Sequence, residues 1–302
     1  MAEQNYVELR HVNKKYKDFQ ASDDINFGIG KGKLIGLLGP SGSGKTTILR
    51  MLAGLEHADS GEIIIDGRVV NDVPASERGI GFVFQNYALF RYMTVYDNIA
   101  FGLDVKKWKK ADIRRRVDEL VELVGLKGFE KRYPNQLSGG QRQRIGIARA
   151  LAVNPEFIIA DEPVSALDVS IQAQILNLLM DLKDEFNFSY LFIAHDLSVV
   201  RHISDRLGVM YLGSIVEMGD KHTLFTNPVH PYTKVLFAAV PTVGEKPLVQ
   251  GIDAKGEIPS PVNLPKGCYF SDRCPYATDR CRQEKPVLRE VEPGHMAACH
   301  LL

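Results

Sequence analysis

The stretch KLIGLLGPSGSGKTT, residues 33–47, decides the fold. It opens with a short apolar run, residues 34–38, which has the length and composition of a buried strand. The run breaks into a glycine-rich loop with the spacing G-x-x-x-x-G-K-T, the pattern of a phosphate-binding loop. Glycines let backbone N–H groups close around phosphates, and a helix predicted over residues 46–54 directs its positive N-terminal end at the same charge. The alternative is a plain glycine turn, against which the strand, the spacing, the lysine and the threonine argue together.

The side chains of this loop suit a triphosphate bound with magnesium. Lys45 supplies a mobile cation for the β- and γ-phosphates, and Thr46 offers a hydroxyl to Mg²⁺. The residues predicted to bind the nucleotide here are Gly39, Pro40, Ser41, Gly42, Ser43, Gly44, Lys45, Thr46 and Thr47. By itself, the loop leaves kinases and GTPases open.

Length and charge limit the classes of protein that can carry this loop. The 302 residues can bury a full core, which predicts one large domain with a smaller appendage. Lys plus Arg and Asp plus Glu both number 37, so no overall positive field attracts nucleic acid. No apolar run approaches the length of a membrane span, and no signal-peptide pattern begins the sequence. We therefore expect a soluble, cytoplasmic chain that meets a membrane only through a partner.

Around the loop, the sequence predicts half-buried strands and then helices. Residues 5–12 and 24–29 alternate apolar and polar side chains, and residues 61–70 have the pattern of a hairpin. The turn predicted between the first two strands carries Tyr16, which either stacks on a purine ring or is an ordinary core or surface tyrosine. Residues 86–135 are mostly helical and predict a subdomain inserted into the sheet domain.

Polar residues follow three further apolar strands, at the edge where parallel α/β sheets bind ligands. Gln85 ends the first strand, Asp161 and Glu162 follow the second, and His195 follows the third. An acidic residue in such a position can hold Mg²⁺ through water, and the next carboxylate can polarise an attacking water. A histidine there is placed to sense a γ-phosphate, although a lone histidine is usually structural. The three strands are predicted at residues 79–85, 157–160 and 190–194.

The motif LSGGQ at residues 137–141 precedes a strongly helical run and predicts a second anion-receptive helix start. Its glycines permit close approach, and Ser138 can donate to a phosphate oxygen. Beyond residue 208 the sequence predicts two short strands and a helix over residues 232–239. Residues 241–302 are rich in Pro, Gly and charge, so we expect an extended, loop-rich tail.

The order GPSGSGKT, Gln85, LSGGQ, FIIADE, SALD and His195 resembles the nucleotide-binding subunit of ABC transporters over roughly residues 5–240. LSGGQ between the phosphate loop and the acidic strand is what separates this pattern from kinases and GTPases. The resemblance implies an α/β P-loop NTPase fold with a RecA-like core sheet, an N-terminal antiparallel β subdomain, an inserted helical subdomain and a loop-rich tail. The implied boundaries are 1–240 for the nucleotide-binding domain, with its helical subdomain at about 86–155, and 241–302 for the C-terminal extension.

The resemblance also implies roles for single residues. Glu162 matches the catalytic glutamate, His195 the switch histidine, and Gln85 the glutamine that touches Mg²⁺ or water. The implied Mg²⁺ contacts are Thr46, Gln85 and Asp161. The implied nucleotide contacts outside the phosphate loop are Tyr16, Ser138, Gly139, Gly140, Gln141 and Asp168. ATP and Mg²⁺ are the implied cofactors.

In this family two ATPase subunits, identical or different, stack head to tail, so that ATP is part of a two-fold interface. ATP binding would close the pair, and the helical subdomain would move whatever grips it. The implied partners are therefore a second ATPase subunit, transmembrane permease subunits and, through them, a substrate-binding protein. The implied place is the cytoplasmic face of the cell membrane, with no nucleic acid partner.

Two parts of the chain resemble different importers. Residues 1–137 resemble sulfate-type anion importers, through the phrases GIGFVFQNYALFRYMTVYDNIAFGL and VPASERG. Residues 142–302 resemble oligopeptide and dipeptide importers, through RQRIGIARALAVNPEFIIADEPVSALDVSIQAQILNLL and NPVHPYTKVL. We therefore expect a hybrid whose joint lies in or beside the signature helix, with peptide import as the leading function and sulfate or thiosulfate import as the alternative. Two further alternatives are a soluble, non-transport ABC ATPase and a hybrid module without a productive membrane partner.

All four cysteines fall in the last 35 residues, at Cys268, Cys274, Cys281 and Cys299. Peptide-type ATPases carry a similar tail, which in some resembles an iron–sulfur site. Four thiolates suit a [4Fe–4S] cluster or zinc, and nearby histidines make a mixed zinc site available. The alternative is four reduced cysteines that hold no metal. Disulfides are not expected in a reducing cytoplasm.

Overall fold

The computed structural model describes residues 5–194, 196–239 and 264–302, and also residues 252, 254, 256–257 and 259–262. The described chain divides into two compact units. The first, which we call the helical unit, comprises residues 30–32 and 73–193. The second, which we call the loop unit, comprises residues 5–29, 33–72 and the described part of 194–302.

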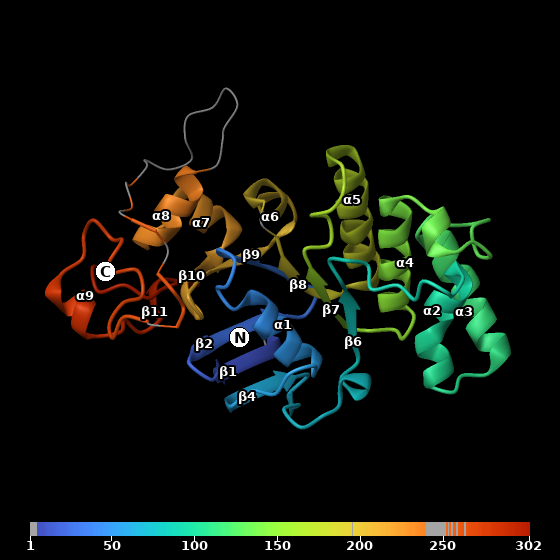
Figure 1. Cartoon of the computed structure of the whole chain (residues 1–302), viewed down its shortest axis with the longest axis horizontal. Helices are drawn as coiled ribbons and strands as arrows, with labels where there is room; N and C mark the ends of the chain where they lie inside the picture. The colour runs from blue at the N-terminus through green and yellow to red at the C-terminus, as the bar shows by residue number, and fades with distance from the viewer. Residues whose placement is uncertain are drawn as a thin grey trace. The chain divides into compact units, whose positions relative to one another are not determined.

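The helical unit combines a parallel sheet with long helices (Figure 1). In chain order its elements are η1 (Ala75–Glu77), β6 (Ile80–Val83), α2 (Val95–Val105), α3 (Lys110–Leu123), η2 (Pro134–Gln136), α4 (Gly139–Leu151), β7 (Phe157–Asp161), α5 (Val169–Phe186) and β8 (Ser189–Ile193). β7 lies between β6 and β8, parallel to both. Val83 is in register with Ala160, and Asp161 with Ile193. The carboxyl ends of the three strands therefore come level with one another at one edge.

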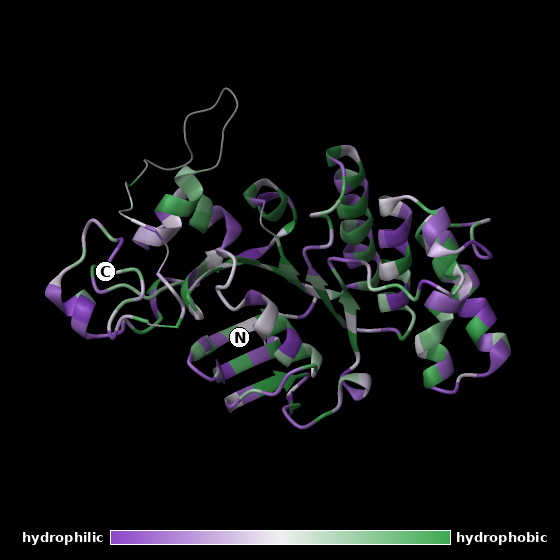
Figure 2. Cartoon of the chain, viewed as in Figure 1, coloured by the Kyte–Doolittle hydropathy of each residue, from purple (hydrophilic) through white to green (hydrophobic). Residues whose placement is uncertain are grey.

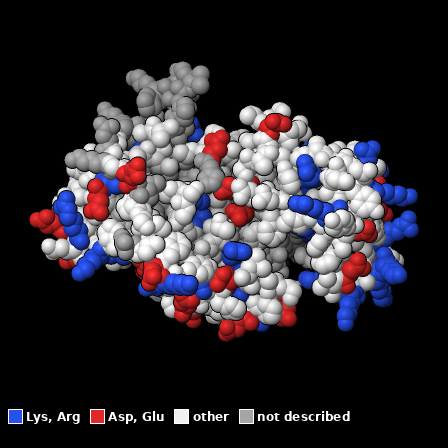
Figure 3. Space-filling view, in the orientation of Figure 1, with Lys and Arg blue, Asp and Glu red and all other residues white. Residues whose placement is uncertain are grey.

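Local signals explain where these helices begin and which face they bury. Thr94 and Asp97 form a capping box at the start of α2. Along α3 the buried residues recur at helical spacing, as predicted, and are Ile113, Val117, Leu120 and Val121. Figure 2 shows the same contrast, with hydrophobic strands and helices of mixed colour. Basic side chains gather over α2 and α3 in Figure 3, and some make exposed ion pairs such as Arg115 with Asp112.

The loop unit contains the phosphate loop and the C-terminal tail. In chain order its elements are β1 (Asn5–Tyr16), β2 (Phe19–Gly30), β3 (Leu34–Leu38), α1 (Lys45–Ala53), β4 (Ser60–Ile65), β5 (Arg68–Val69), α6 (Leu197–Ile203), β9 (Arg206–Tyr211), β10 (Ser214–Asp220), α7 (Lys221–Thr226), α8 (Pro231–Ala238), α9 (Asp279–Gln283), β11 (Arg289–Glu292) and β12 (His295–Ala297). One sheet has the order β2-β1-β4-β5, with β4 antiparallel to both neighbours. The other runs β11-β12-β10-β9-β3, in which β3 and β9 are parallel.

Two predictions about this unit need correction. β1 continues to Tyr16, so the turn lies at residues 17–18 and the tyrosine ends a strand instead of lying in a turn. The tail is loop-rich as predicted, but residues 264–302, which we call the tail, are not extended. Three contacts hold the tail against the rest of the unit. β12 pairs with β10 in the sheet, Ala298 N–H donates to Val216 O (2.9 Å), and the Phe270 ring packs on Tyr211.

A buried carboxylate joins β10 to the tail and to the start of α8. The Glu217 side chain is fully buried; its Oε1 accepts from Val229 N–H (2.8 Å) and lies 2.7 Å from His295 Nε2. Its Oε2 accepts from His230 N–H at 3.1 Å. A buried carboxylate needs this many donors, since a lone one would be strongly destabilising.

We predict that the neighbouring His230 makes the fold sensitive to mild acid. Burial lowers the pKa of His230 to about 4, against the opposing effect of Glu217. Because an unfolded histidine titrates near 6.5, the unfolded state binds more protons between those values, and the free energy of unfolding falls as pH falls through that window. The expected loss is about 3 kcal/mol. Urea unfolding at pH 7 and pH 4.5 checks it.

The matched variant is His230→Asn, whose side-chain oxygen can still accept from Tyr232 N–H as His230 Nδ1 does (3.0 Å). It should lose less stability than the parent between these two pH values. Equal losses in the two proteins would contradict the assignment to His230.

Candidate functional site

The phosphate loop of the loop unit folds its lysine inward. Lys45 is 5% exposed, and its Nζ donates to Gly39 O (2.7 Å), Pro40 O (2.9 Å) and Ser43 Oγ (3.3 Å). The ammonium is therefore held inside the loop by oxygens that an incoming phosphate would replace. This confirms the predicted strand–loop–helix arrangement of β3 and α1 around the motif.

Two glycines show why the loop has its composition. Gly44, at the N-cap of α1, has φ +94°, and a Cβ there would lie 2.0 Å from Ala21 O. Gly42 has φ +78° with open space around it, so backbone conformation alone requires glycine. No side chain caps α1, and the N-terminal end of a helix favours an anion.

Tyr16 lies beside the end of this loop. Burial, followed by the nearby Glu56 carboxylate, raises the pKa of its phenol, while Thr47 acts in the opposite direction. The ring is 38% exposed, stacks with Phe19 at 6.4 Å between centroids, and has the Lys14 ammonium 5.2 Å from its centre. A partly exposed aromatic face next to a phosphate loop suits a purine, which keeps the stacking prediction open.

In the helical unit, the structure joins two predicted residues. Gln85 Nε2 donates to Glu162 Oε2 at 3.0 Å and approaches Ser165 Oγ at 3.3 Å. Glu162 N–H donates to Ile193 O at 3.1 Å, and its φ is +45°. A non-glycine residue in the left-handed region is uncommon and concentrates at functional sites. The carboxylate is thus held in a fixed place, just past the end of β7.

The LSGGQ motif begins α4 as predicted. Ser138 is the N-cap: its Oγ accepts from Gln141 N–H (3.3 Å), and Gln141 Oε1 accepts from Ser138 N–H (3.0 Å). Ser138 is exposed, whereas Gly140 is buried against α5, where a Cβ would lie 2.6 Å from Ile171 Cγ2. The helix start therefore presents the exposed Ser138 on the surface of this unit, at the positive end of the α4 dipole.

Sequence reasoning missed Arg149, which ties the segment after Gln85 to α4. Its Nη1 donates to Ala88 O (2.6 Å) and its Nη2 to Tyr87 O (3.1 Å), and burial lowers the pKa of the guanidinium. Tyr87 and Ala88 both have positive φ, +59° and +47°. The only signal in the sequence was a charged residue on the otherwise apolar face of a predicted helix.

The remaining predicted residues are placed as follows. Asp161 ends β7 and is half-buried, and Asp168 is the N-cap residue of α5. Thr46 lies exposed in the first turn of α1. His195 lies outside the described residues. Residues 39–47 belong to the loop unit, whereas Gln85, residues 138–141, Glu162 and Asp168 belong to the helical unit.

A groove of about 760 Å³ opens on the helical unit next to Gln85. Its lining includes Asn86, Tyr87, Tyr92, Tyr133, Asn135 and Arg142. The Tyr92 side chain is 96% exposed and Tyr133 is 44% exposed. Large exposed aromatic side chains around a concave surface are typical of a protein-binding site.

The four cysteines of the tail are free thiols. Burial, with smaller contributions from the neighbouring thiols Cys299, Cys281 and Cys274, raises the pKa of Cys268 to about 11. They are therefore near enough to act on one another electrostatically. Within the described part of the chain, however, no three His, Cys, Asp or Glu side chains come together as a metal-ion site. The described side chains as placed therefore fit neither a cluster, which needs converging thiolates, nor zinc, which needs converging Cys or His ligands.

Comparison with known proteins decides the family. The ABC transporter family matches residues 22–165, and the family described as "Oligopeptide/dipeptide transporter, C-terminal region" matches residues 216–281. The oligopeptide transport ATP-binding protein AppF of Bacillus subtilis (strain 168) is 44% identical, covering 99% of this chain and 98% of AppF. The chain belongs to the ABC transporter family of ATP-binding subunits. It is an ATPase of the ABC type.

Other relatives agree along the whole length. The putative oligopeptide transport ATP-binding protein YkfD of Bacillus subtilis (strain 168) is 47% identical over 95% of this chain and 91% of its own. The di/tripeptide transport ATP-binding protein DppF of Pseudomonas aeruginosa (strain UCBPP-PA14) is 42% identical over 98% of this chain and 94% of its own. These matches include residues 1–137, so the prediction of a sulfate-type segment in a hybrid ABC subunit gains no support from them.

Solved structures give the same fold. The dimeric post-hydrolysis structure of the ATP-binding cassette MJ0796 with ADP and Pi has a TM-score of 0.65 and 34% identity, covering 71% of this chain and 98% of that one. CbiO1 of Clostridium perfringens, part of the ABC transporter complex cbiONQ, has a TM-score of 0.69 and 28% identity, covering 74% and 92%. The predicted α/β P-loop fold, with an antiparallel N-terminal sheet and a helical insertion, is confirmed. Among the described helices, none has the length and apolar character of a membrane span.

Proposed function

We propose that this ABC subunit hydrolyses ATP to energise the import of oligopeptides or dipeptides. One observation carries the peptide assignment: the similarity extends beyond the cassette into residues 216–281, the region described as that of oligopeptide and dipeptide transporters. That region includes most of β10, the strand with which β12 of the tail pairs. Sulfate or thiosulfate import is not carried further, since no relative described above supports it, and neither is a non-transport ABC ATPase.

The direct experiment reconstitutes the chain with the permease and binding protein of a peptide importer in liposomes. We expect ATP hydrolysis that rises when a peptide is supplied with its binding protein. Stimulation by sulfate with a sulfate-type permease, and none by peptides, would overturn the assignment.

We propose these roles within the ATPase reaction. Gly39–Thr47 bind the phosphates, Lys45 neutralises the β- and γ-phosphates, and Tyr16 stacks on the base. Glu162 polarises the attacking water, and Gln85, which already contacts it, orients that carboxylate. Mg²⁺ would neutralise phosphate charge, and Thr46, Gln85 and Asp161 supply oxygen ligands that suit it. His195 would act as the switch histidine and Asp168 as a nucleotide contact, as the family resemblance predicts.

We also propose that the working unit is a head-to-tail pair of ABC subunits, which are either two copies or this chain with a close relative. Ser138 and the exposed start of α4 would then meet the γ-phosphate held by the other subunit. The dimeric state of the related cassette MJ0796 supports the pairing.

The groove beside Gln85 would receive the permease. It carries exposed aromatic side chains, and it adjoins the segment that Arg149 ties to the signature helix. A permease that presses on this groove could therefore affect Glu162 through Gln85. This would hold the chain on the cytoplasmic face of the membrane without a spanning helix.

Tyr92→Ala tests this docking surface. We expect permease-dependent stimulation of ATP hydrolysis to fall by about tenfold or more, because truncating a central exposed aromatic side chain commonly costs 2 kcal/mol or more of binding. Basal hydrolysis should not change, since Tyr92 is 96% exposed and has no proposed catalytic role. Tyr276→Ala, at a tyrosine of the tail that is 53% exposed, is the control. Equal stimulation of all three proteins would rule out Tyr92 as a docking residue.

A metal site in the cysteine tail remains a second proposal, supported by four free cysteines that are all buried or partly buried. If Cys268, Cys274, Cys281 and Cys299 hold a [4Fe–4S] cluster or zinc, the tail must rearrange from the placement described above. Iron and zinc analysis of anaerobically purified protein, with its visible absorbance, decides between the metals. A colourless protein free of both metals would leave the four cysteines as reduced thiols.

A further inference from the structure

We propose that Lys285 and Tyr269 in the tail are positioning residues for the phosphate loop, and that they act through Asp23. The inference rests on the proposed phosphate-binding role of residues 39–47. All the contacts that carry it lie within the loop unit. It gives the C-terminal tail a part in nucleotide binding.

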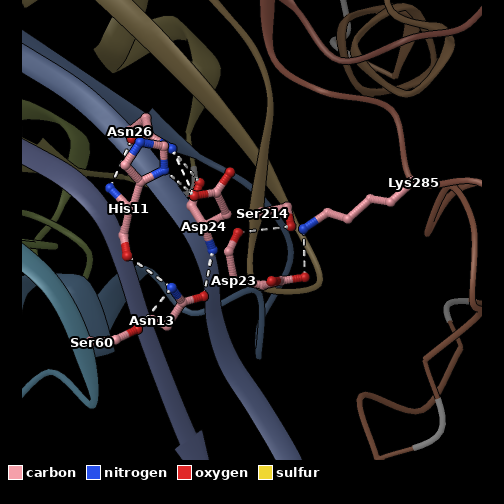
Figure 4. Close-up of polar contacts among 8 residues, drawn as sticks. All are labelled: His11, Asn13, Asp23, Asp24, Asn26, Ser60, Ser214 and Lys285. Carbon is pink, nitrogen blue, oxygen red and sulfur yellow. Dashed lines mark hydrogen bonds and ion pairs between the residues drawn. The ribbon is translucent and has the colours of Figure 1, made fainter.

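The first step is a clamp on one carboxylate. Lys285 Nζ and the Tyr269 hydroxyl both donate to Oδ2 of Asp23, in β2; Figure 4 shows Lys285 reaching across to it. The Lys285 ammonium also lies 5.1 Å from the centre of the Tyr269 ring. The Asp23 side chain is only 23% exposed, so these charge-assisted bonds are partly shielded from water.

The second step runs through the backbone of Asp23. Its N–H donates to Gly213 O at 2.8 Å, and its carbonyl oxygen accepts from Ser214 Oγ at 3.3 Å. Gly213 lies in the turn between β9 and β10, and Ser214 is the first residue of β10. The clamp therefore fixes this part of β2 against that turn.

The third step reaches the phosphate loop. Gly213 N–H donates to Ser43 O at 3.0 Å, and Ser43 is 1% exposed. Gly213 has φ +82°, and β2 approaches it closely, because an added Cβ there would lie 3.0 Å from Gln20 O. Gly44, the residue after Ser43, packs directly on Ala21, which lies two residues before Asp23. The loop is thus braced on the same short part of β2 that the tail holds.

The clamp is not what attaches the tail. β12 pairs with β10 at Glu217 and Met218, and the buried contact between His295 and Glu217 secures the same edge. Removing Lys285 should therefore leave the tail docked while the support of β2 loosens. A loss of nucleotide affinity without a loss of the tail is the result that separates positioning from simple folding.

The experiment compares Lys285→Met and Tyr269→Phe with the parent. We expect KM for ATP to rise about 5- to 20-fold with kcat unchanged, the size of an ordinary coupling between sites. Lys285→Arg should restore most of the affinity. Asp23→Asn combined with Lys285→Met should be no worse than either single change, because both break the same clamp. Arg280→Met is the control, since Arg280 lies in the tail and pairs with Glu284 away from Asp23.

Reciprocity gives an independent readout. If the tail positions the loop, MgATP must in turn slow hydrogen exchange in residues 264–302 of the parent, and do so less in Lys285→Met. An unchanged KM in Lys285→Met with a docked tail would overturn the inference, as would equal effects on kcat and KM that arginine does not rescue. Lys45→Met separates this from the proposed function: if it binds ATP like the parent, the assignment of the loop itself fails.

Discussion

Glu162→Gln is expected to bind ATP as the parent does and to hydrolyse it about 100- to 10,000-fold more slowly, the usual contribution of a positioned general base. The change keeps the size and shape of the side chain, and glutamine tolerates the left-handed backbone at residue 162 as well as glutamate does. What it removes is the carboxylate that accepts the proton of the attacking water. ATP should then hold the paired subunits together, because the step that releases them is blocked.

Two measurements check this prediction: steady-state phosphate release, and the elution volume with and without MgATP. Glu156→Gln is the matched control, because Glu156 lies in the same unit, is exposed and pairs with Lys31 at the surface. Hydrolysis at the parental rate by Glu162→Gln would show that another group is the base. An equal loss in Glu156→Gln would point to a general effect on the fold.

Lys45→Met is expected to weaken ATP binding by about 10- to 150-fold, since a hydrogen bond to a charged group contributes about 1.5–3 kcal/mol. Methionine fills a similar length but cannot donate. The parent lysine already makes bonds to three loop oxygens, so its ammonium lies where phosphate oxygens would arrive. Hydrolysis should fall at least as far as binding, because the same ammonium neutralises charge on the γ-phosphate.

Thermal unfolding with and without MgATP provides the measurement, because a ligand stabilises only the protein that binds it. The parent should gain stability on adding nucleotide, and Lys45→Met should gain little. Lys17→Met, an exposed lysine in the turn between β1 and β2 of the same unit, serves as control. Equal nucleotide stabilisation of Lys45→Met and the parent would contradict the role of the loop.

The structure was best predicted from the sequence where the residues that determine an element lie within one short segment. The glycines, Lys45 and the apolar strand before them are local, and β3, the loop and α1 follow within one residue of the prediction. The neighbourhood of Gln85 and Glu162 was accessible in outline, because both follow parallel strands that turn out to be adjacent. The rule that ligands bind at the carboxyl ends of parallel strands predicts the edge of the sheet at which both residues lie. Only the structure shows the 3.0 Å hydrogen bond from Gln85 Nε2 to Glu162 Oε2.

Contacts between distant segments were out of reach. Arg149 meets the carbonyl of a residue 61 positions away, and backbone carbonyls leave no mark in a sequence. Lys285 and Asp23 are 262 positions apart, and each is an ordinary charged residue in its own segment. The Pro-, Gly- and charge-rich composition of residues 241–302 predicted an extended tail. That prediction was wrong because the pairing of β12 with β10 depends on the partner strand and not on local propensity. The prediction of a sulfate-type segment rested on short phrases within residues 1–137. The peptide-transport relatives are instead similar along nearly the whole chain.

Mixing two inactive variants tests the central claim, that each reaction centre needs the signature helix of a second ABC subunit. Lys45→Met lacks the phosphate contact but keeps Ser138, whereas Ser138→Phe keeps the phosphate loop but blocks the helix start. If the centre forms across a pair, a mixed pair contains one intact centre, so the mixture should hydrolyse ATP well above the sum of the two proteins assayed alone. A mixture no more active than that sum, under conditions in which the two variants form mixed pairs, would contradict the account.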